Sequence, residues 1–501
     1  MFTYISQAIS SIFTPFGLML SLLGALYGMI VGAIPGLNAT TAIILALPLT
    51  YAMDTIPSYI LLIAVWIGGI SGGYIGSVLV GIPGTIGSVA TVYDGYEMTK
   101  KGESGRALSV CAVANFLGTV PSLIIAMFAS GLISRVAVKM GAWEIFSLCM
   151  CALVLVVTLS KGNFFKGMIA TGLGLLLSEV GFAPTCGTLR FTFGMYQLTG
   201  GFTLVCVMMG LFAGRVIILE YAKEERMGAK KHIEVGKFVN PLPDYKNNIK
   251  NTIRSFFIGL WIGFLPGMGS ALSNVVAYAQ EQSSSKHPDE FGKGCVDGVI
   301  APEVANNASV GGALIPAIAL GIPGDGATAI LLGALIMHGL EAGPLLMTKE
   351  PQLVYTIFTC GIFAGIFVLL CQIFGVKLLP KLLNVDYHWL YPAIVAFVFL
   401  GSYISSPNSF TLFATLGLTV LGLWMTYAGI PASPFCLAFV LGNMVELNFR
   451  RAMSYPNATV WSFFSRPVSA FFLIVALASV AWPYIREHFF AGKNLAAEDD
   501  D

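Results

Sequence analysis

Long uncharged, apolar runs fill most of this chain. The first 53 residues contain no Asp, Glu, Lys, Arg or His, residues 55–93 form a second uncharged run, and residues 107–134 form a third. A helix needs about 20 apolar residues to cross a bilayer, so the chain has room for roughly 12 membrane segments. The pattern therefore predicts an all-α, polytopic membrane protein.

Pro-Gly pairs interrupt these runs twice, in the same order. Pro35-Gly36 is followed by Pro83-Gly84 in the first half, and Pro266-Gly267 is followed by Pro323-Gly324 in the second half. Open backbone is tolerated in a membrane only where it is buried in protein or lines a cavity. Paired breaks in two halves of a chain are the best sequence indication of a transporter's binding site. We therefore predict a duplicated fold with its site at the breaks.

Polar stretches divide the chain into five predicted segments. These are a first transmembrane repeat at 1–220, a linker at 221–253, a second repeat at 254–430, additional membrane segments at 431–485 and a polar, acidic tail at 486–501. Because Lys and Arg concentrate in cytoplasmic loops, the basic linker is predicted to be cytoplasmic.

The charged loops differ between the two halves in a way that predicts inversion. In the loop after the first Pro-Gly pair, the first half has no basic residue at 51–57, whereas the second half has Lys286 and Lys293. In the loop after the second pair the bias is reversed, and the basic residues Lys100, Lys101 and Arg106 lie in the first half. Equivalent loops would then lie on opposite sides of the membrane, as in inverted-topology repeats. Basic residues at both ends of 255–280 favour a re-entrant helical hairpin; the alternative is a kinked span.

Small polar residues follow each break and form the predicted substrate site. A helix that begins after Pro-Gly presents free N–H groups and a positive dipole end, which attract an anion. The alternative is that small residues only permit close helix packing. The candidate residues are Pro35, Gly36, Asn38, Thr40, Thr41, Pro83, Gly84, Thr85, Pro266, Gly267, Ser270, Ser273, Asn274, Pro323 and Gly324.

A second set of polar residues is predicted to couple transport to an ion. It consists of Glu303, Asn306, Asn307, Asp325 and Thr328. Carboxylate and amide oxygens suit a hard cation, so Na⁺ is a candidate at Glu303, Asn306, Asn307 and Asp325, with H⁺ as the other choice. The alternatives are N-capping by Asp325 and an interhelical hydrogen-bond network around the other residues.

Composition excludes several other classes of function. Net charge is +1, which argues against a nucleic-acid partner. The sequence has no HExxH, GxSxG or P-loop motif, so we expect no enzyme, no cofactor and no ATP site on this chain.

The motifs resemble the large membrane subunit of the tripartite tricarboxylate transporters, the TctA family. The resemblance rests on residues 32–48, 71–96 and 101–108 in the first half, and on 265–270, 301–308 and 311–324 in the second. It implies a bacterial inner-membrane permease that works with a small membrane subunit and a periplasmic solute-binding protein. It also implies import of a carboxylate, driven by Na⁺ or H⁺, with an elevator-like movement.

Two other functions remain open from the sequence. One is a stand-alone, ion-coupled exchanger or exporter of organic anions, and the other is an anion channel. The substrate is also open, because related systems take tricarboxylates, dicarboxylates or aromatic acids, and this chain departs from the family's usual residues at 38–41, Asp297 and Asp325.

Overall fold

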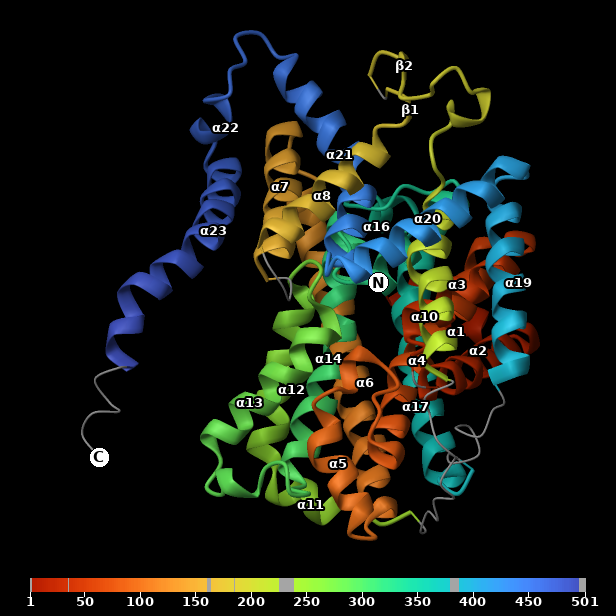
Figure 1. Cartoon of the computed structure of the whole chain (residues 1–501), viewed down its shortest axis with the longest axis vertical. Helices are drawn as coiled ribbons and strands as arrows, with labels where there is room; N and C mark the ends of the chain where they lie inside the picture. The colour runs from red at the N-terminus through yellow and green to blue at the C-terminus, as the bar shows by residue number, and fades with distance from the viewer. Residues whose placement is uncertain are drawn as a thin grey trace. The chain divides into compact units, whose positions relative to one another are not determined.

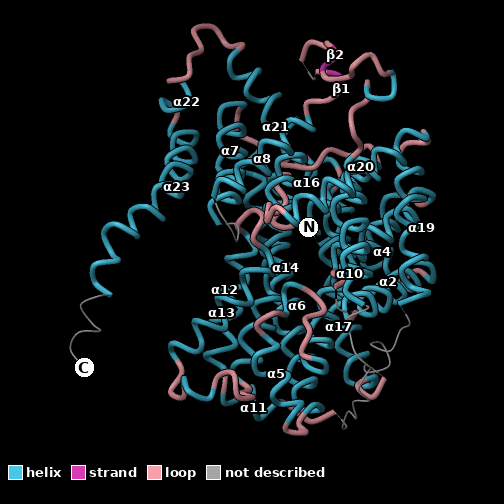
Figure 2. The backbone as a smooth tube through the Cα atoms, in the orientation of Figure 1, coloured by secondary structure: helices cyan, strands magenta, loops and turns pink. Residues whose placement is uncertain are grey.

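The computed structural model describes residues 2–34, 36–159, 164–183, 185–224, 238–378 and 387–494, and most of them are helical (Figures 1 and 2). The chain forms two compact units, each made from separate stretches of sequence. Unit 1 combines residues 1–138 with 203–424, and unit 2 combines 139–202 with 425–501.

Unit 1 contains all four Pro-Gly breaks. Its elements are α1 (Phe2–Ile12), α2 (Pro15–Ala33), α3 (Ala39–Ala46), η1 (Leu47–Ala52), α4 (Thr55–Val80), η2 (Ile86–Ser88), α5 (Thr91–Lys100), α6 (Ser104–Ala137), α9 (Leu204–Met208), the π-helical η4 (Met209–Gly214), α10 (Arg215–Glu224), α11 (Leu242–Asn247), α12 (Ile249–Phe264), α13 (Gly269–Ser284), η5 (Pro288–Glu290), α14 (Asp297–Leu320), α15 (Gly326–Met337), α16 (Leu346–Lys349), α17 (Pro351–Gly375), α19 (Tyr387–Ser405) and α20 (Ser409–Tyr427).

Unit 2 pairs the helices that precede the linker with those at the C-terminal end. Its elements are α7 (Ala142–Leu159), α8 (Phe164–Ser178), β1 (Gly181–Phe182), β2 (Leu189–Arg190), η3 (Tyr196–Leu198), α21 (Ala432–Met453), α22 (Ser462–Ser465) and α23 (Pro467–Asn494). Helix α23 runs into the region predicted to be a polar tail, and residues 495–501 lie outside the described part of the chain.

A short hairpin in unit 2 is fixed by ion pairs. Strands β1 and β2 pair antiparallel, and the Arg190 guanidinium donates to both carboxylate oxygens of Glu446, at 2.6 and 2.9 Å. Arg190 also pairs with Glu179. Cys186, in the turn of the hairpin, is exposed.

Six helices among the described residues are long and apolar enough to cross a bilayer. They are Pro15–Ala33, Thr55–Val80, Ser104–Ala137, Pro351–Gly375, Ser409–Tyr427 and Ala432–Met453. Shorter apolar helices accompany them, including α8 and α15. The all-α, polytopic prediction is confirmed, whereas the count of roughly 12 segments stays a prediction.

Two long helices, α4 and α14, form the core of unit 1, and glycines bring their neighbours into backbone contact. A Cβ added at Gly28 or Gly32 of α2 would collide with a carbonyl oxygen of α4, and one at Gly259 or Gly263 of α12 would collide with a carbonyl oxygen of α14. Small residues at helix interfaces permit this approach, as is common in membrane proteins. A later glycine on α2 contacts a later residue of α4, and the same order holds for α12 and α14. Helix α2 is therefore parallel to α4, and α12 is parallel to α14.

The two parallel pairs run in opposite directions. Helix α4 ends near Lys100, because Thr99 donates to the carbonyl of Val78 at 2.7 Å. Helix α14 begins at this same end, where the Lys101 ammonium donates to the carbonyl of Lys293 at 2.5 Å. We call this end of unit 1, which carries the α5–α6 junction, α11 and the α13–α14 loop, the basic end; it is the lower end in Figure 1.

Helices α12 and α13 fold back on each other as a hairpin. Arg254, near the start of α12, forms an ion pair with Glu281, near the end of α13, and the turn between the helices reaches only to the middle of α14, where Gly263 contacts Ser309. Both ends of the hairpin therefore lie at the basic end. This is the geometry expected of the predicted hairpin.

Candidate functional site

The residues on either side of the proline in the first Pro-Gly break have matching backbone conformations in the two halves. Helix α2 is followed by extended Ile34 (φ −75°, ψ 119°) and α12 by extended Leu265 (φ −76°, ψ 127°). Gly36 (φ 88°) and Gly267 (φ 76°) then adopt the left-handed region that glycine tolerates best. Pro35 lies outside the described residues.

The second break also matches between the halves. Helices α4 and α14 end in a left-handed glycine, Gly81 (φ 76°) and Gly321 (φ 73°), each directly before Ile-Pro-Gly. Gly84 donates its N–H to the carbonyl of Gly73 at 3.1 Å. A Cβ at Gly324 would lie 2.7 Å from the Cα of Ala313, so Pro83-Gly84 and Pro323-Gly324 both return the chain against the helix it has just left.

Two of the helix starts are capped by residues predicted to bind ligands. The Asn38 side chain accepts from the Thr41 N–H at 2.8 Å. The Asp325 carboxylate accepts from the Thr328 N–H at 2.8 Å, while the Thr328 hydroxyl accepts from the Asp325 N–H at 2.9 Å. This reciprocal capping box is the alternative that the sequence left open for Asp325. Asp325 and Thr328 are thus engaged in starting α15, and a role for them in ion coupling stays a prediction.

The starts of four segments from the two halves meet inside unit 1. A Cβ at Gly326 would lie 3.7 Å from the Thr40 hydroxyl, one at Gly269 would lie 2.7 Å from the Cβ of Asp325, and one at Gly87 would lie 2.9 Å from the Cβ of Ser270. Each contact follows a Pro-Gly break, and the first and third join elements from different halves. The structure therefore brings the segments that follow the four breaks close together, and among them are Thr40 and Ser270 of the predicted substrate set and Asp325 of the predicted ion set.

Asn274, in α13, is hydrogen-bonded to η2 and to the residue that precedes α5. Its side-chain amide donates to the carbonyl of Ile86 at 3.2 Å and its oxygen accepts from the Ala90 N–H at 3.2 Å. Ser273 is buried and donates to the carbonyl of Ser270. Thr85 lies 3.4 Å from the Ser88 hydroxyl, packed against α4. These polar groups fix the junction between the halves.

Helix α13 differs from α3 and α15 because no side chain caps its start. Its N-cap residue is Met268, so the first N–H groups of a 16-residue helix have no side-chain acceptor. Such an end carries a partial positive charge. It is also flanked by acidic groups, with Asp325 against Gly269 and the Glu303–Asn306 pair near Ser270.

Glu303 is a fully buried carboxyl at the junction of the halves. It accepts from the Thr91 hydroxyl at 2.5 Å and from the Asn306 amide at 3.5 Å. No ion pair to Glu303 is present among the described residues. A buried, unpaired carboxylate is costly, and the predicted role of Glu303 in ion coupling stays a prediction.

Asn307 lies at the centre of a network that joins three helices. Its amide donates to the Asn115 side chain at 2.6 Å and to the carbonyl of Glu303 at 3.0 Å. Its oxygen accepts from Thr119 at 3.1 Å and Ser71 at 3.3 Å. The interhelical network that the sequence offered as an alternative is therefore present at Asn307.

Sequence reasoning did not single out three members of this network as functional candidates. Asn115 and Thr119 come from α6, and Gln372 of α17 donates to the carbonyl of Ser71 at 2.8 Å. All three are buried. Asn115 and Gln372 could have been found from the sequence, because each is a side-chain amide inside an otherwise apolar run. Polar residues in membrane helices commonly serve function or helix packing.

Asn306 is bonded quite differently from its neighbour. Its side-chain oxygen is buried and has no hydrogen-bond partner in the described structure, and it points at Gly87, since a Cβ there would collide with it. A buried carbonyl without a donor is destabilising, which makes Asn306 a candidate for function over stability.

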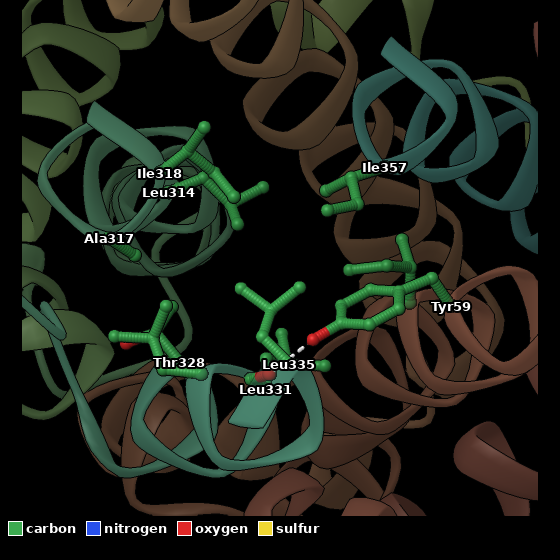
Figure 3. Close-up of a pocket in the computed structure, with 10 residues that line it drawn as sticks. Tyr59, Leu314, Ala317, Ile318, Thr328, Leu331, Leu335 and Ile357 are labelled. Carbon is green, nitrogen blue, oxygen red and sulfur yellow. Dashed lines mark hydrogen bonds between the residues drawn. The ribbon is translucent and has the colours of Figure 1, made fainter. Parts of the chain in front are cut away.

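A small cavity lies beside α15 (Figure 3). Tyr59, Leu314, Ile318 and Ile357 line it together with Thr328, and its volume is about 10 Å³. A cavity needs about 10–15 Å³ of such volume to hold one water molecule. This apolar cavity is therefore too small for an organic acid.

Comparison with known proteins identifies the family. The family described as "Tripartite tricarboxylate transporter TctA family" matches residues 18–437. The chain belongs to the TctA family. It is accordingly a multi-pass membrane component of a tripartite tricarboxylate transporter, a class of transporters and not of enzymes. A tripartite system implies further subunits.

Two relatives from Agrobacterium vitis are similar to this TctA-family chain. One, described as "Uncharacterized 52.8 kDa protein in TAR-I ttuC' 3'region", is 33% identical over 479 residues, covering 95% of each chain. The other, "Uncharacterized protein in TAR-II ttuC' 3'region", is 34% identical over 242 residues, covering 48% of this chain and all of the relative. No solved structure matches.

Proposed function

We propose that this chain is the permease subunit of a secondary-active carboxylate importer in the bacterial inner membrane. A periplasmic solute-binding protein delivers the substrate, a small membrane subunit completes the complex, and a Na⁺ or H⁺ gradient drives uptake. Family membership supports the tripartite assembly. The geometry at the start of α13 supports the coupling.

Opposed helix directions support two inverted-topology repeats. Helices α2 and α4 run toward the basic end, and α12 and α14 run away from it. The breaks that follow α2 and α12 both lie against the middle of a long helix, at Gly69 and Ser309 respectively. With the basic end in the cytoplasm, both breaks would lie near the bilayer midplane, where transporters of this kind bind substrate.

The uncapped start of α13 is the observation that carries the proposal. Its free N–H groups and dipole favour a substrate carboxylate. Two acidic side chains lie near it. Asp325 lies beside Gly269, and Glu303 accepts a hydrogen bond from Asn306, which lies near Ser270. Like charges about 5 Å apart repel by roughly 3 kcal/mol at an effective dielectric constant of about 20. Substrate therefore binds well only after H⁺ or Na⁺ neutralises these carboxylates, which is the physical basis of symport.

A reconstituted system tests the function directly. Vesicles containing this chain and its small subunit are assayed for uptake of a panel of carboxylates, with and without the binding protein, under separate Na⁺ and H⁺ gradients. We expect uptake that needs both the binding protein and one gradient. Uptake without the binding protein would favour an exchanger instead, unitary currents would favour a channel, and uptake with every gradient collapsed would refute symport.

Ser270 tests the substrate site within the same assay. Ser270→Ala removes one neutral hydrogen bond worth about 0.5–1.5 kcal/mol, so the apparent affinity for substrate should fall roughly 2- to 10-fold. The apparent affinity for the coupling ion should change less. Ser283→Ala, on the exposed end of the same helix, is the matched control and should leave both affinities unchanged. An equal loss of both affinities in Ser270→Ala would contradict the assignment.

A further inference from the structure

A second, larger cleft lies at the opposite end of unit 1 from the basic end. Its volume is about 440 Å³, and residues of α1, α6, α16 and α17 line it. It contains none of the predicted substrate or ion residues. This volume falls within the range of ligand-binding sites. The residues that line the cleft then indicate which class of ligand would fit it.

An unpaired cation lies in this cleft. Arg135, in the last turn of α6, is exposed and makes no hydrogen bond or ion pair to any residue in the described part of the chain. The adjacent Ser134 is 3% exposed, and its buried hydroxyl has no partner there either. Both side chains line the cleft and offer hydrogen-bond donors that the protein itself does not use.

The start of α17 adds a second positive element. This 25-residue helix has no side-chain cap, and its first residue, Pro351, lines the cleft. Its free N–H groups and dipole favour a negative charge. The N-cap residue Glu350 carries the opposite charge, but its side chain is exposed and lies outside the lining. The cleft is thus built for one anionic group.

The remaining walls are apolar and belong to a membrane-facing surface. Phe128 and Leu132, one turn apart on the candidate span α6, are 56% and 67% exposed. Tyr4 and Tyr355 stack in the cleft with ring centroids 6.1 Å apart. Tyrosines and terminal arginines of spans gather at the level of lipid headgroups. A ligand here needs an anionic head and an apolar tail.

We infer that this cleft binds the phosphate of an anionic phospholipid between Arg135 and the start of α17, with an acyl chain along Phe128 and Leu132. A soluble carboxylate would leave the apolar wall unused. Because the site shares no residue with the proposed transport path, the inference holds whatever the substrate is.

Native mass spectrometry of the delipidated full chain tests this inference. Dioleoyl phosphatidylglycerol and dioleoyl phosphatidylethanolamine are titrated separately onto the wild type, Arg135→Gln and Lys349→Gln. Lys349 is an exposed cation of α16 outside the lining and serves as the matched control. We expect phosphatidylglycerol to bind more tightly than phosphatidylethanolamine, and to bind about tenfold more weakly to Arg135→Gln but normally to Lys349→Gln.

Three results would overturn the inference. Equal binding of phosphatidylglycerol to the wild type and Arg135→Gln would remove the arginine's role. Equal weakening in Lys349→Gln would show general charge attraction instead of a site. Complete displacement of the lipid by millimolar inorganic phosphate or citrate would show that the cleft recognises a soluble anion, whereas persistence of the lipid supports the inference.

Discussion

Asn306 and Asn307 are adjacent, equally buried and identical in type, yet their side chains are hydrogen-bonded very differently. Asn307 makes four hydrogen bonds, two as donor and two as acceptor. Asn306 makes one long side-chain bond, at 3.5 Å, and leaves its oxygen unpaired. We predict that Asn307→Ala destabilises the protein, whereas Asn306→Ala mainly impairs ion coupling.

The magnitude follows from the bonds lost. Hydrogen bonds between membrane helices average about 0.6 kcal/mol, so the three bonds that join Asn307 to α4 and α6 contribute roughly 2 kcal/mol. Asn306→Ala loses less than one such bond and removes a buried, unsatisfied oxygen. Both substitutions delete the same atoms, so the cavity cost is similar and cancels in the comparison. The unfolding midpoint of Asn307→Ala should fall about 2–4 °C below that of Asn306→Ala.

The assay is thermal unfolding of each purified variant in one detergent, followed by uptake at a temperature where both are folded. Asn306→Ala should require a higher concentration of the coupling ion for half-maximal uptake. If Asn306→Ala melts as early as Asn307→Ala, or if it transports with unchanged ion dependence, the distinction between a structural and a functional amide is wrong.

Three further predictions follow from the helix caps, the glycine contacts and the charged ends. Asp325→Asn keeps a good N-cap, so stability should change by less than about 0.5 kcal/mol while the apparent affinity for the coupling ion shifts; unchanged ion dependence would leave Asp325 with capping alone. Gly32→Leu should sharply reduce the yield of folded protein measured by size-exclusion chromatography, because even a Cβ there collides with the carbonyl of Gly69; a normal yield would show that α2 can move away from α4. Single cysteines at Lys250 and Glu341, both exposed at opposite ends of unit 1, should react with an impermeant maleimide from the cytoplasm and the periplasm respectively, and the reverse pattern would invert the topology.

The sequence predicted the breaks well because they depend on local chemistry. At the first break of each half, the glycine that follows the proline takes the left-handed conformation that glycine tolerates best, as Gly36 and Gly267 show. Capping by Asp325 was likewise foreseeable, because Asp and Thr three residues apart form a capping box through neighbouring backbone groups.

The sequence could not show which helices meet. The partners of Asn307 come from α4 and α6, 188 to 236 positions away along the chain, and nothing local indicates that α6 faces α14. Gln372 was missed for the same reason. The pairing also distinguishes Asn306 from Asn307, which a helical pattern places side by side but which point at different neighbours.

The hairpin in unit 2 gives the native chain a chemical reporter. Of its nine thiols, Cys186 is the exposed one, and a hydrogen bond with the Thr188 hydroxyl lowers the pKa of Cys186, which increases the reactive thiolate. The other eight are buried or half-buried. A fluorophore can therefore be attached at one known position without removing any cysteine, and the rate of its attachment would report when another molecule covers that turn.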